Sequence, residues 1–257
     1  MNSTSGCVST SALMRSRTAM GLSSTGRRTR TGRIRGCVLY CLSPPDHAAA
    51  MPIEPRPLPC APAAFVPHLA PEQVERHRQA QQRTLDALDA LRDAGDDDAA
   101  PDLARLAVEA RGALAAHAAQ AWAEEFHWAA LGPARGDEPG EPGGALAAAI
   151  QQAFGDPARM RERFAEAAGR LSGPGWLWLA QRRDGRLAIL ATPASATPLT
   201  GGDTPLLACC LWPHAMPEGD DALARYLAGF WALVDWQVVE ARLDRAREAS
   251  RAGAGPG

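Results

Sequence analysis

The chain has 257 residues, 46% of them hydrophobic, so it can bury a sizeable core in one large or two small domains. Its formal net charge is -2 and its pI is about 6.3, a balance that gives no reason to expect nucleic acid or an anionic membrane as a partner. No apolar run approaches the roughly 20 residues that cross a bilayer, so we expect no membrane span.

Residues 1–50 differ in kind from the rest of the chain. They are rich in Ser, Thr and Arg, contain no acidic residue before Asp46, and show neither a helical nor a strand period. Such a segment cannot bury enough apolar surface to offset its ordering entropy. We expect a disordered or non-native extension: an organellar transit peptide or, by preference, upstream sequence read in frame before a true start at Met51.

Residues 51–135 predict an N-terminal antiparallel helical hairpin. A proline-rich, extended lead-in covers 51–67, and a helix begins at Pro71, with Glu72 in its first turn, and runs to about Asp93. The acidic segment Ala94–Asp98 then breaks the chain. A second long helix is expected over 101–131, where apolar residues recur at helical spacing.

The Gly- and Pro-rich loop 132–144 marks the predicted boundary to a second domain, 136–247. We expect helices over 145–154 and 157–170, and a hairpin of strands 176–181 and 186–192 that turns at Asp184-Gly185. A third strand is expected over 206–211 and one or two helices over 220–247, followed by a disordered tail, 248–257. The predicted class is α+β, a helical hairpin followed by an α/β domain with a three-stranded antiparallel sheet.

The six cysteines have neither the spacing of a compact disulfide scaffold nor that of a CxxC zinc module, so we expect a reducing, cytoplasmic setting. Two of the site candidates, Cys210 and His214, lie four positions apart at the end of the predicted third strand. A thiolate and an imidazole are both metal ligands. Taken alone, this pair is weak evidence for a metal, because a lone His is more often a core histidine and adjacent Cys residues are more often small buried apolar side chains.

Three further segments carry a resemblance. Ala119–Trp128, Gly173–Leu179 and Phe230–Trp236 resemble, in order and spacing, motifs of the iron/manganese superoxide dismutase family. The resemblance spans roughly Leu58 to Arg247. It implies the helical hairpin and α/β domain, and one iron or manganese ion held by three His and one Asp that converts superoxide to dioxygen and hydrogen peroxide.

The resemblance places the four metal ligands at His77, Glu124, Cys210 and His214. His77 and His214 keep the family residue, whereas Glu124 stands at a His position and Cys210 at the Asp position. A carboxylate and a thiolate also bind transition metals, so we expect a retained but altered site, with zinc an alternative and no metal if the site is lost. His127, one helical turn after Glu124, is either an additional ligand or, as we prefer, a polar group behind the ligands.

The residues expected around the metal are changed in part. Gln120 matches the catalytic Gln of the iron-type enzymes, but the family's gateway Tyr falls on Leu85 and its neighbouring His on Gln81. A Leu side chain cannot relay a proton. The aromatic residues that enclose the family's site are kept, although large aromatics there are also core residues; these are Trp122, Trp128, Trp176, Trp178 and Trp212.

Three functions remain open at this point. The first is a superoxide dismutase, with superoxide as its substrate and turnover slowed or abolished by the altered ligands. The second is a binding or structural protein that keeps the fold without the reaction, and the third is a metalloprotein with different chemistry. A homodimer is expected to be weakened, because the Glu that bridges subunits in the family is Pro213 here.

Overall fold

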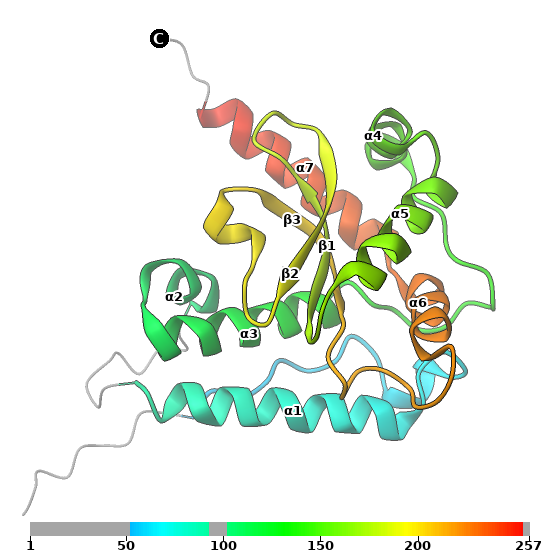
Figure 1. The fold of residues 1–257 in the computed structure, drawn as a ribbon. Helices are drawn as coiled ribbons and strands as arrows, with labels where there is room; N and C mark the ends of the chain where they lie inside the picture. Colours follow the sequence, from blue (N-terminus) through cyan, green and yellow to red (C-terminus); the bar gives the residue numbers. More distant parts are fainter. Residues whose placement is uncertain (1–51, 93–101, 254–257) are drawn as a thin grey trace, which may run out of the picture. The chain divides into compact units, whose positions relative to one another are not determined.

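The computed structural model describes residues 52–92 and 102–253 (Figure 1). The predicted extension 1–50, the acidic break Ala94–Asp98 and the last four residues of the predicted tail lie outside the described residues. No helix in the described part of the chain is long and apolar enough to cross a membrane.

The first long helix, α1, runs from Pro71 to Asp89 and follows a short 3-10 helix, η1 (Pro62–Phe65). Pro71 occupies the first helical turn, where its fixed φ suits the helix and its missing N–H is not needed. Buried side chains recur every three or four positions along α1 and so form one face; they include Val74, His77, Gln81, Leu85 and Leu88. This face turns His77 toward the rest of the molecule.

The second helix of the hairpin is not continuous, which corrects the single helix predicted over 101–131. Instead α2 (Leu103–Glu109) and α3 (Gly112–Trp128) meet at an extended junction. Ala110 and Arg111 are extended and Gly112 has a φ of +64°, a conformation that Gly adopts readily. The helix therefore changes direction at Gly112, and α3 rather than one long helix packs against α1.

The C-terminal half holds the sheet. Strands β1 (Gly175–Gln181), β2 (Leu187–Pro193) and β3 (Thr204–Cys210) pair antiparallel in the order β2-β1-β3. The β1–β2 hairpin turns where predicted, with Gly185 at a φ of +82°. The predicted α+β class with a three-stranded antiparallel sheet is confirmed.

Helices enclose this sheet (Figure 1). The helix α5 (Pro157–Arg170) packs against β1 and β2, and α3 packs against β3. Preceding α5, α4 (Gly144–Phe154) contacts both α5 and the last helix, α7. The C-terminal segment forms two helices, α6 (Ala222–Leu233) and α7 (Trp236–Gly253).

The last helix extends further than expected. Residues 248–253, assigned to a disordered tail on sequence, belong to α7. Arg251 lies in its last turn, where a cation interacts favourably with the helix dipole. The predicted domain boundary near residue 135 stays a prediction.

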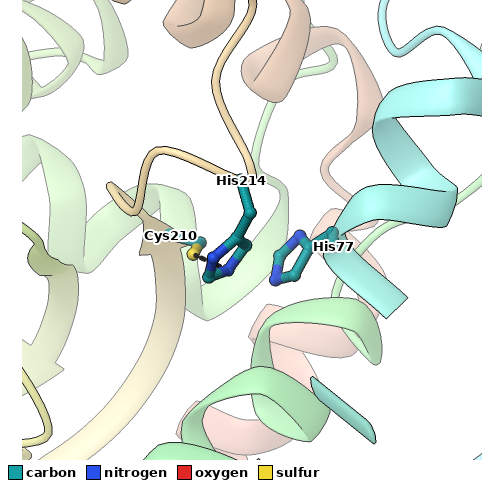
Figure 2. A group of neighbouring side chains, drawn as sticks. All are labelled: His77, Cys210 and His214. Carbon is teal, nitrogen blue, oxygen red and sulfur yellow. Dashed lines mark hydrogen bonds between the residues drawn. The ribbon is translucent and has the colours of Figure 1, made fainter. Parts of the chain in front are cut away.

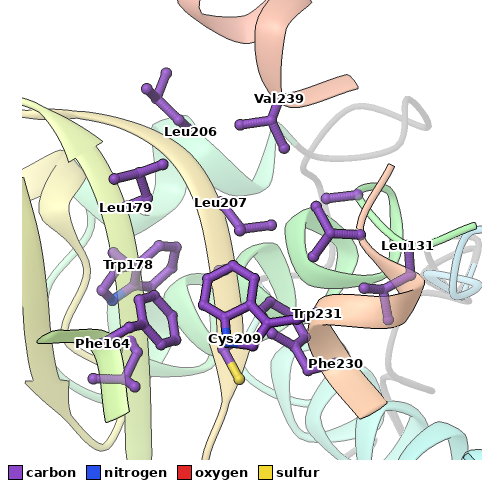
Figure 3. Packing of buried hydrophobic residues seen from close by; sticks show 14 of the residues in the cluster. Leu131, Phe164, Trp178, Leu179, Leu206, Leu207, Cys209, Phe230, Trp231 and Val239 are labelled. Carbon is purple, nitrogen blue, oxygen red and sulfur yellow. The ribbon is translucent and has the colours of Figure 1, made fainter. Parts of the chain in front are cut away.

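Two hydrophobic clusters hold these elements together. The larger one joins the sheet to α3, α5, α6 and α7 and contains fully buried aromatic side chains, among them Trp178, Phe164 and Phe230 (Figure 3). The smaller one lies between α1, α2 and α3, and Leu85 and Leu88 are fully buried in it. Because α1, α3 and β3 are all fixed by these cores, side chains projecting from them are held in defined relative positions.

Candidate metal centre

Three side chains from two distant parts of the sequence converge at one point: His77, Cys210 and His214 (Figure 2). Their possible ligand atoms all lie within 4.8 Å of one another. His77 comes from the middle of α1, Cys210 is the last residue of β3, and His214 lies in the turn that follows. The sulfur of Cys210 lies 3.9 Å from Nε2 of His214.

The local backbone explains how the end of β3 delivers two of these groups. Cys210 is paired with Trp176 of β1, and the N–H of Leu211 donates to the carbonyl of Gly175 at 2.9 Å. The chain then leaves the sheet through Pro213, which has no N–H with which to continue the ladder. A turn closed by the N–H of Ala215 donating to the carbonyl of Trp212 carries His214 back toward the strand end.

A hydrogen bond ties this turn to α1. The side-chain amide of Gln73 donates to the carbonyl oxygen of Ala215, and Gln73 is buried. Gln73 precedes His77 by four positions, so both side chains leave the same face of α1. Sequence reasoning missed Gln73, and that shared face was the available signal.

Burial keeps the imidazoles of His77 and His214 neutral at pH 7. His77 is 2% exposed, and burial followed by the neighbouring His127 and His214 holds its pKa well below the usual range. Burial likewise lowers the pKa of His214 to about 4. Nε2 of His77 is buried and has no hydrogen-bond partner within the described residues. A neutral imidazole with an unshared nitrogen is the form that binds a metal ion.

The Cys210 thiol is protonated in these surroundings. Its side chain is fully buried, and burial, followed by the negative charge of Glu124, raises its pKa well above the ordinary value. A bound cation would reverse this balance, because a metal ion favours the thiolate that coordinates it.

Glu124, the fourth predicted ligand, is not in the group of three. It projects from α3, is fully buried, and accepts a 2.7 Å hydrogen bond at Oε1 from the amide of Gln120. Its other oxygen, Oε2, has no partner in the described part of the chain. Burial raises the pKa of this carboxyl to about 7.

Gln120 is itself held from the sheet side. Nε1 of Trp176 donates to Oε1 of Gln120 at 3.2 Å, which leaves the Gln120 amide nitrogen to donate to Glu124. The two successive hydrogen bonds, from Trp176 to Gln120 and from Gln120 to Glu124, therefore occupy Oε1 of Glu124 and leave Oε2 without a partner among the described residues.

His127 lies beside the group of three but outside it. Its Nδ1 is 3.0 Å from the carbonyl oxygen of Ala208, which can only accept, so Nδ1 carries the proton. Its ring lies 5.5 Å from that of His77 and stacks on Phe230 at 5.9 Å. Burial lowers the pKa of His127 to about 4.

The five tryptophans predicted to enclose the site lie at different distances from the group of three. Trp128 and Trp212 border it directly, with ring centroids 4.6 Å from His77 and 5.8 Å from His214 respectively. Trp176 contacts it through Gln120. Trp122 and Trp178 stack on each other at 5.7 Å and lie farther out in the core. Such surroundings exclude bulk water and strengthen electrostatic interactions inside.

Gln81 and Leu85, the two positions at which the sequence predicts a departure from the family's proton path, are both fully buried. Gln81 accepts a 2.6 Å hydrogen bond at its amide oxygen from Arg78, a residue that sequence reasoning did not single out. Leu85 packs into the smaller hydrophobic cluster. No side-chain hydroxyl stands at either position.

Comparison with known proteins identifies the family of this chain. Residues 142–242 match the family model described as iron/manganese superoxide dismutases, C-terminal domain. The chain is 37% identical to proteins named superoxide dismutase [Fe] from Salmonella typhimurium and Escherichia coli over 191 residues, covering 72% of this chain and 95% of each relative. A Legionella pneumophila protein of the same name is 35% identical over 188 residues, with 72% and 96% covered. The chain therefore belongs to the iron/manganese superoxide dismutase family.

Proposed function

We propose that this chain is a superoxide dismutase-like metalloprotein with an altered ligand set. In this proposal His77, Cys210 and His214 hold one iron or manganese ion, and Glu124 is the fourth ligand. The observation that carries the proposal is the convergence of the first three residues, whose ligand atoms lie within 4.8 Å of one another; His77 and Cys210 are buried and His214 is half-buried.

The donor set supports a transition metal. Two neutral imidazoles, a thiol that a cation would ionise, and one free carboxylate oxygen are ligand types that first-row metals accept. Two of these atoms, Nε2 of His77 and Oε2 of Glu124, are buried without a partner among the described residues, which is costly unless something binds them. A metal ion held by the group of three would satisfy Nε2 of His77, and the proposal requires Glu124 to move its Oε2 into the same ligand set.

A bound iron or manganese ion would supply one-electron chemistry, by which one superoxide is oxidised to dioxygen and a second is reduced to hydrogen peroxide. The chain's own residues position that chemistry. Gln120 orients Glu124, and the tryptophans exclude water. Leu85, at the position of the family's Tyr, offers no proton, so we propose that peroxide formation is slower than in relatives that keep the Tyr.

One observation favours a second candidate, a protein that keeps the fold and has lost the reaction. Leu85 is fully buried in an apolar cluster and has no group that transfers a proton, and Glu124 lies outside the group of three converging ligands. A third candidate is a zinc protein with mixed His, Cys and Glu ligands, because zinc binds all three of these side chains.

We also propose a reducing, cytoplasmic location and a weakened homodimer. Free thiols at Cys60, Cys209 and Cys210 are consistent with a reducing compartment. Pro213 stands where the family has the bridging Glu, and it lines an apolar hollow with Leu211 and Met216. A proline cannot supply the charged contact between subunits.

The deciding experiment is metal analysis of untagged protein, followed by a superoxide assay. We expect one iron or manganese per chain and turnover below that of the iron-type relatives. Stoichiometric zinc without turnover would favour the third candidate, and metal-free protein would favour the second.

A double variant tests the site itself. Cys210→Ala with His214→Ala is expected to lose the metal while circular dichroism shows the fold intact. The matched control is Cys209→Ala with His117→Ala, which removes the same residue types from outside the group of three. Unchanged metal content in the first variant would refute the proposed ligands.

A further inference from the structure

A second concave site lies outside the group of three. A cleft of about 900 Å³ opens between the N-terminal lead-in, α1, α2, α3 and α7. We call it the arginine cleft because four arginines line it: Arg56, Arg78, Arg242 and Arg245. Its volume is in the range of small-molecule sites, roughly 300–1,000 Å³.

Three of these arginines have no carboxylate within 4.0 Å among the described residues: Arg78, Arg242 and Arg245. Neutral acceptors hold two of them. Arg242 donates to the carbonyl oxygens of Leu206 at 2.9 Å and Phe126 at 3.0 Å, and Arg78 donates to Gln81. These hydrogen bonds fix the positions of Arg78 and Arg242 without a direct ion pair, and Glu124, Glu125 and Glu75 stabilise the charge of Arg78 from a greater distance.

Three acidic residues also line the cleft, one fewer than its four arginines. Glu125 is paired with Arg56 at 3.0 Å, and Asp102 caps α2 by accepting from the N–H of Arg105. Glu54 is exposed on the lead-in. Burial, followed by repulsion from Arg245, lowers the pKa of Arg242 to about 10, so a negative charge bound near this pair would relieve a real cost.

The rest of the lining is apolar and aromatic. The guanidinium of Arg242 lies 3.5 Å from the centroid of the Phe126 ring, and Trp122 packs on Phe126 at 5.0 Å. Ile53 and Leu103 also line the cleft. A ligand that fills this volume must therefore present hydrocarbon as well as charge.

Two buried donors on the lining lack a partner in the described part of the chain. The amide nitrogen of Gln81, a residue with no exposed surface, and the indole nitrogen of Trp128, 3% exposed, are both unpaired. Both groups can only donate, so the atom that satisfies them must be an acceptor. This observation is independent of the arginines and indicates the same kind of ligand.

We propose that the arginine cleft binds an organic anion, with its oxyanion head held by Arg78 and Arg245 and its apolar body against Trp122 and Phe126. Carboxylates and phosphates share the geometry that a guanidinium recognises in two parallel hydrogen bonds. The proposal does not depend on the metal centre, and binding is expected to persist in the variant Cys210→Ala with His214→Ala.

The test is a titration of the full chain with four probes by isothermal calorimetry, with tryptophan fluorescence as a second readout because Trp122 and Trp128 line the cleft. Decanoate or decyl phosphate is expected to bind, and the tighter of the two identifies the head group. Decanol, which lacks the charge, and inorganic phosphate, which lacks the apolar body, are expected to bind at least about tenfold more weakly. Equal binding of either control, or no binding by any probe, overturns the proposal.

A pair of variants on α7 localises the site. Arg245→Gln removes a cleft arginine and is expected to weaken decanoate or decyl phosphate binding by roughly tenfold. Arg247→Gln removes the same charge two positions later, where the side chain lines a different hollow, and should bind as the unaltered protein does. Circular dichroism confirms the fold of both. Equal affinity of the two variants would place the ligand elsewhere and refute the cleft.

Discussion

The imidazole rings of His77 and His214 lie 4.8 Å apart between centroids, although one belongs to the first long helix and the other follows the last strand. No covalent or local constraint brings them together. Their approach depends on the packing of α1 against the turn after β3, and the side-chain hydrogen bond from Gln73 to the carbonyl of Ala215 is a direct link between these two segments.

Removing the hydrogen bond between Gln73 and Ala215 is expected to lower both the stability of the protein and its affinity for a metal. In Gln73→Ala the buried carbonyl of Ala215 loses its side-chain partner, so the free energy of unfolding should fall by about 1–3 kcal/mol. Metal affinity should fall with it, because His214 is carried by the same turn. Urea denaturation and metal competition measure the two effects. Gln79→Ala, which removes an exposed amide bonded to Glu75 on the same helix, is the control and should change neither.

The raised pKa of the Glu124 carboxyl predicts an unusual pH dependence for the stability of the metal-free protein. Burial raises its pKa from 4.5 to about 7, so between these values the folded state binds more protons than the unfolded state. Stability contributed by this group therefore falls as pH rises from about 4.5 to 7, and the full loss of about 3 kcal/mol is present above pH 7.

Glu124→Gln removes the titration and isolates this effect. The variant is expected to be more stable than the unaltered metal-free protein at pH 8 and nearly equal to it at pH 4.5. Chemical denaturation at several pH values gives the two curves. Glu72→Gln, at an exposed position in the first turn of α1, is the control. Parallel curves for Glu124→Gln and the unaltered protein would show that the carboxyl is not buried as described.

Features that depend on local sequence could be predicted. The Asp184-Gly185 turn, the start of α1 at Pro71 and the end of β3 beside Cys210 all follow from residues within a few positions of each other. The break at Gly112 could not be predicted in the same way. Apolar residues continue at helical spacing on both sides of it, and a Gly inside such a pattern is compatible with either an unbroken helix or a positive φ.

The candidate site could be predicted only in part, because some of its contacts depend on tertiary packing. Cys210 and His214 were singled out by their spacing at a strand end and His77 by the resemblance, and the structure brings these three together. The state of Glu124 depends on Gln120, which in turn depends on an indole N–H from β1. Such a chain of contacts between a helix and a strand is set by tertiary packing, and no spacing along the sequence encodes it.

Two glycines with open surroundings allow the conformational explanation of the α2–α3 junction to be tested. An added Cβ would meet nothing within 4 Å at either Gly112 or Gly169. Gly112 has a positive φ, so Gly112→Ala should lower the free energy of unfolding by about 1–2 kcal/mol. Gly169 lies within α5, so Gly169→Ala should raise it by up to about 1 kcal/mol. Thermal or urea denaturation distinguishes the signs, and stabilisation by Gly112→Ala would contradict the observed junction.

The gateway position offers a final test. Leu85→Tyr restores the residue type that the family carries there, but Leu85 is fully buried among Leu88, Leu103 and Ala118. A larger ring in this closely packed cluster should cost about 1–3 kcal/mol of stability, whereas Leu85→Met, which keeps the volume, should cost less than about 1.5 kcal/mol. Superoxide turnover should not recover in Leu85→Tyr, because the apolar cluster and not solvent surrounds the new hydroxyl. If Leu85→Tyr were stable and its superoxide turnover were raised, α2 would have to move away from position 85. The packing of α1, α2 and α3 described above would then not be the active arrangement.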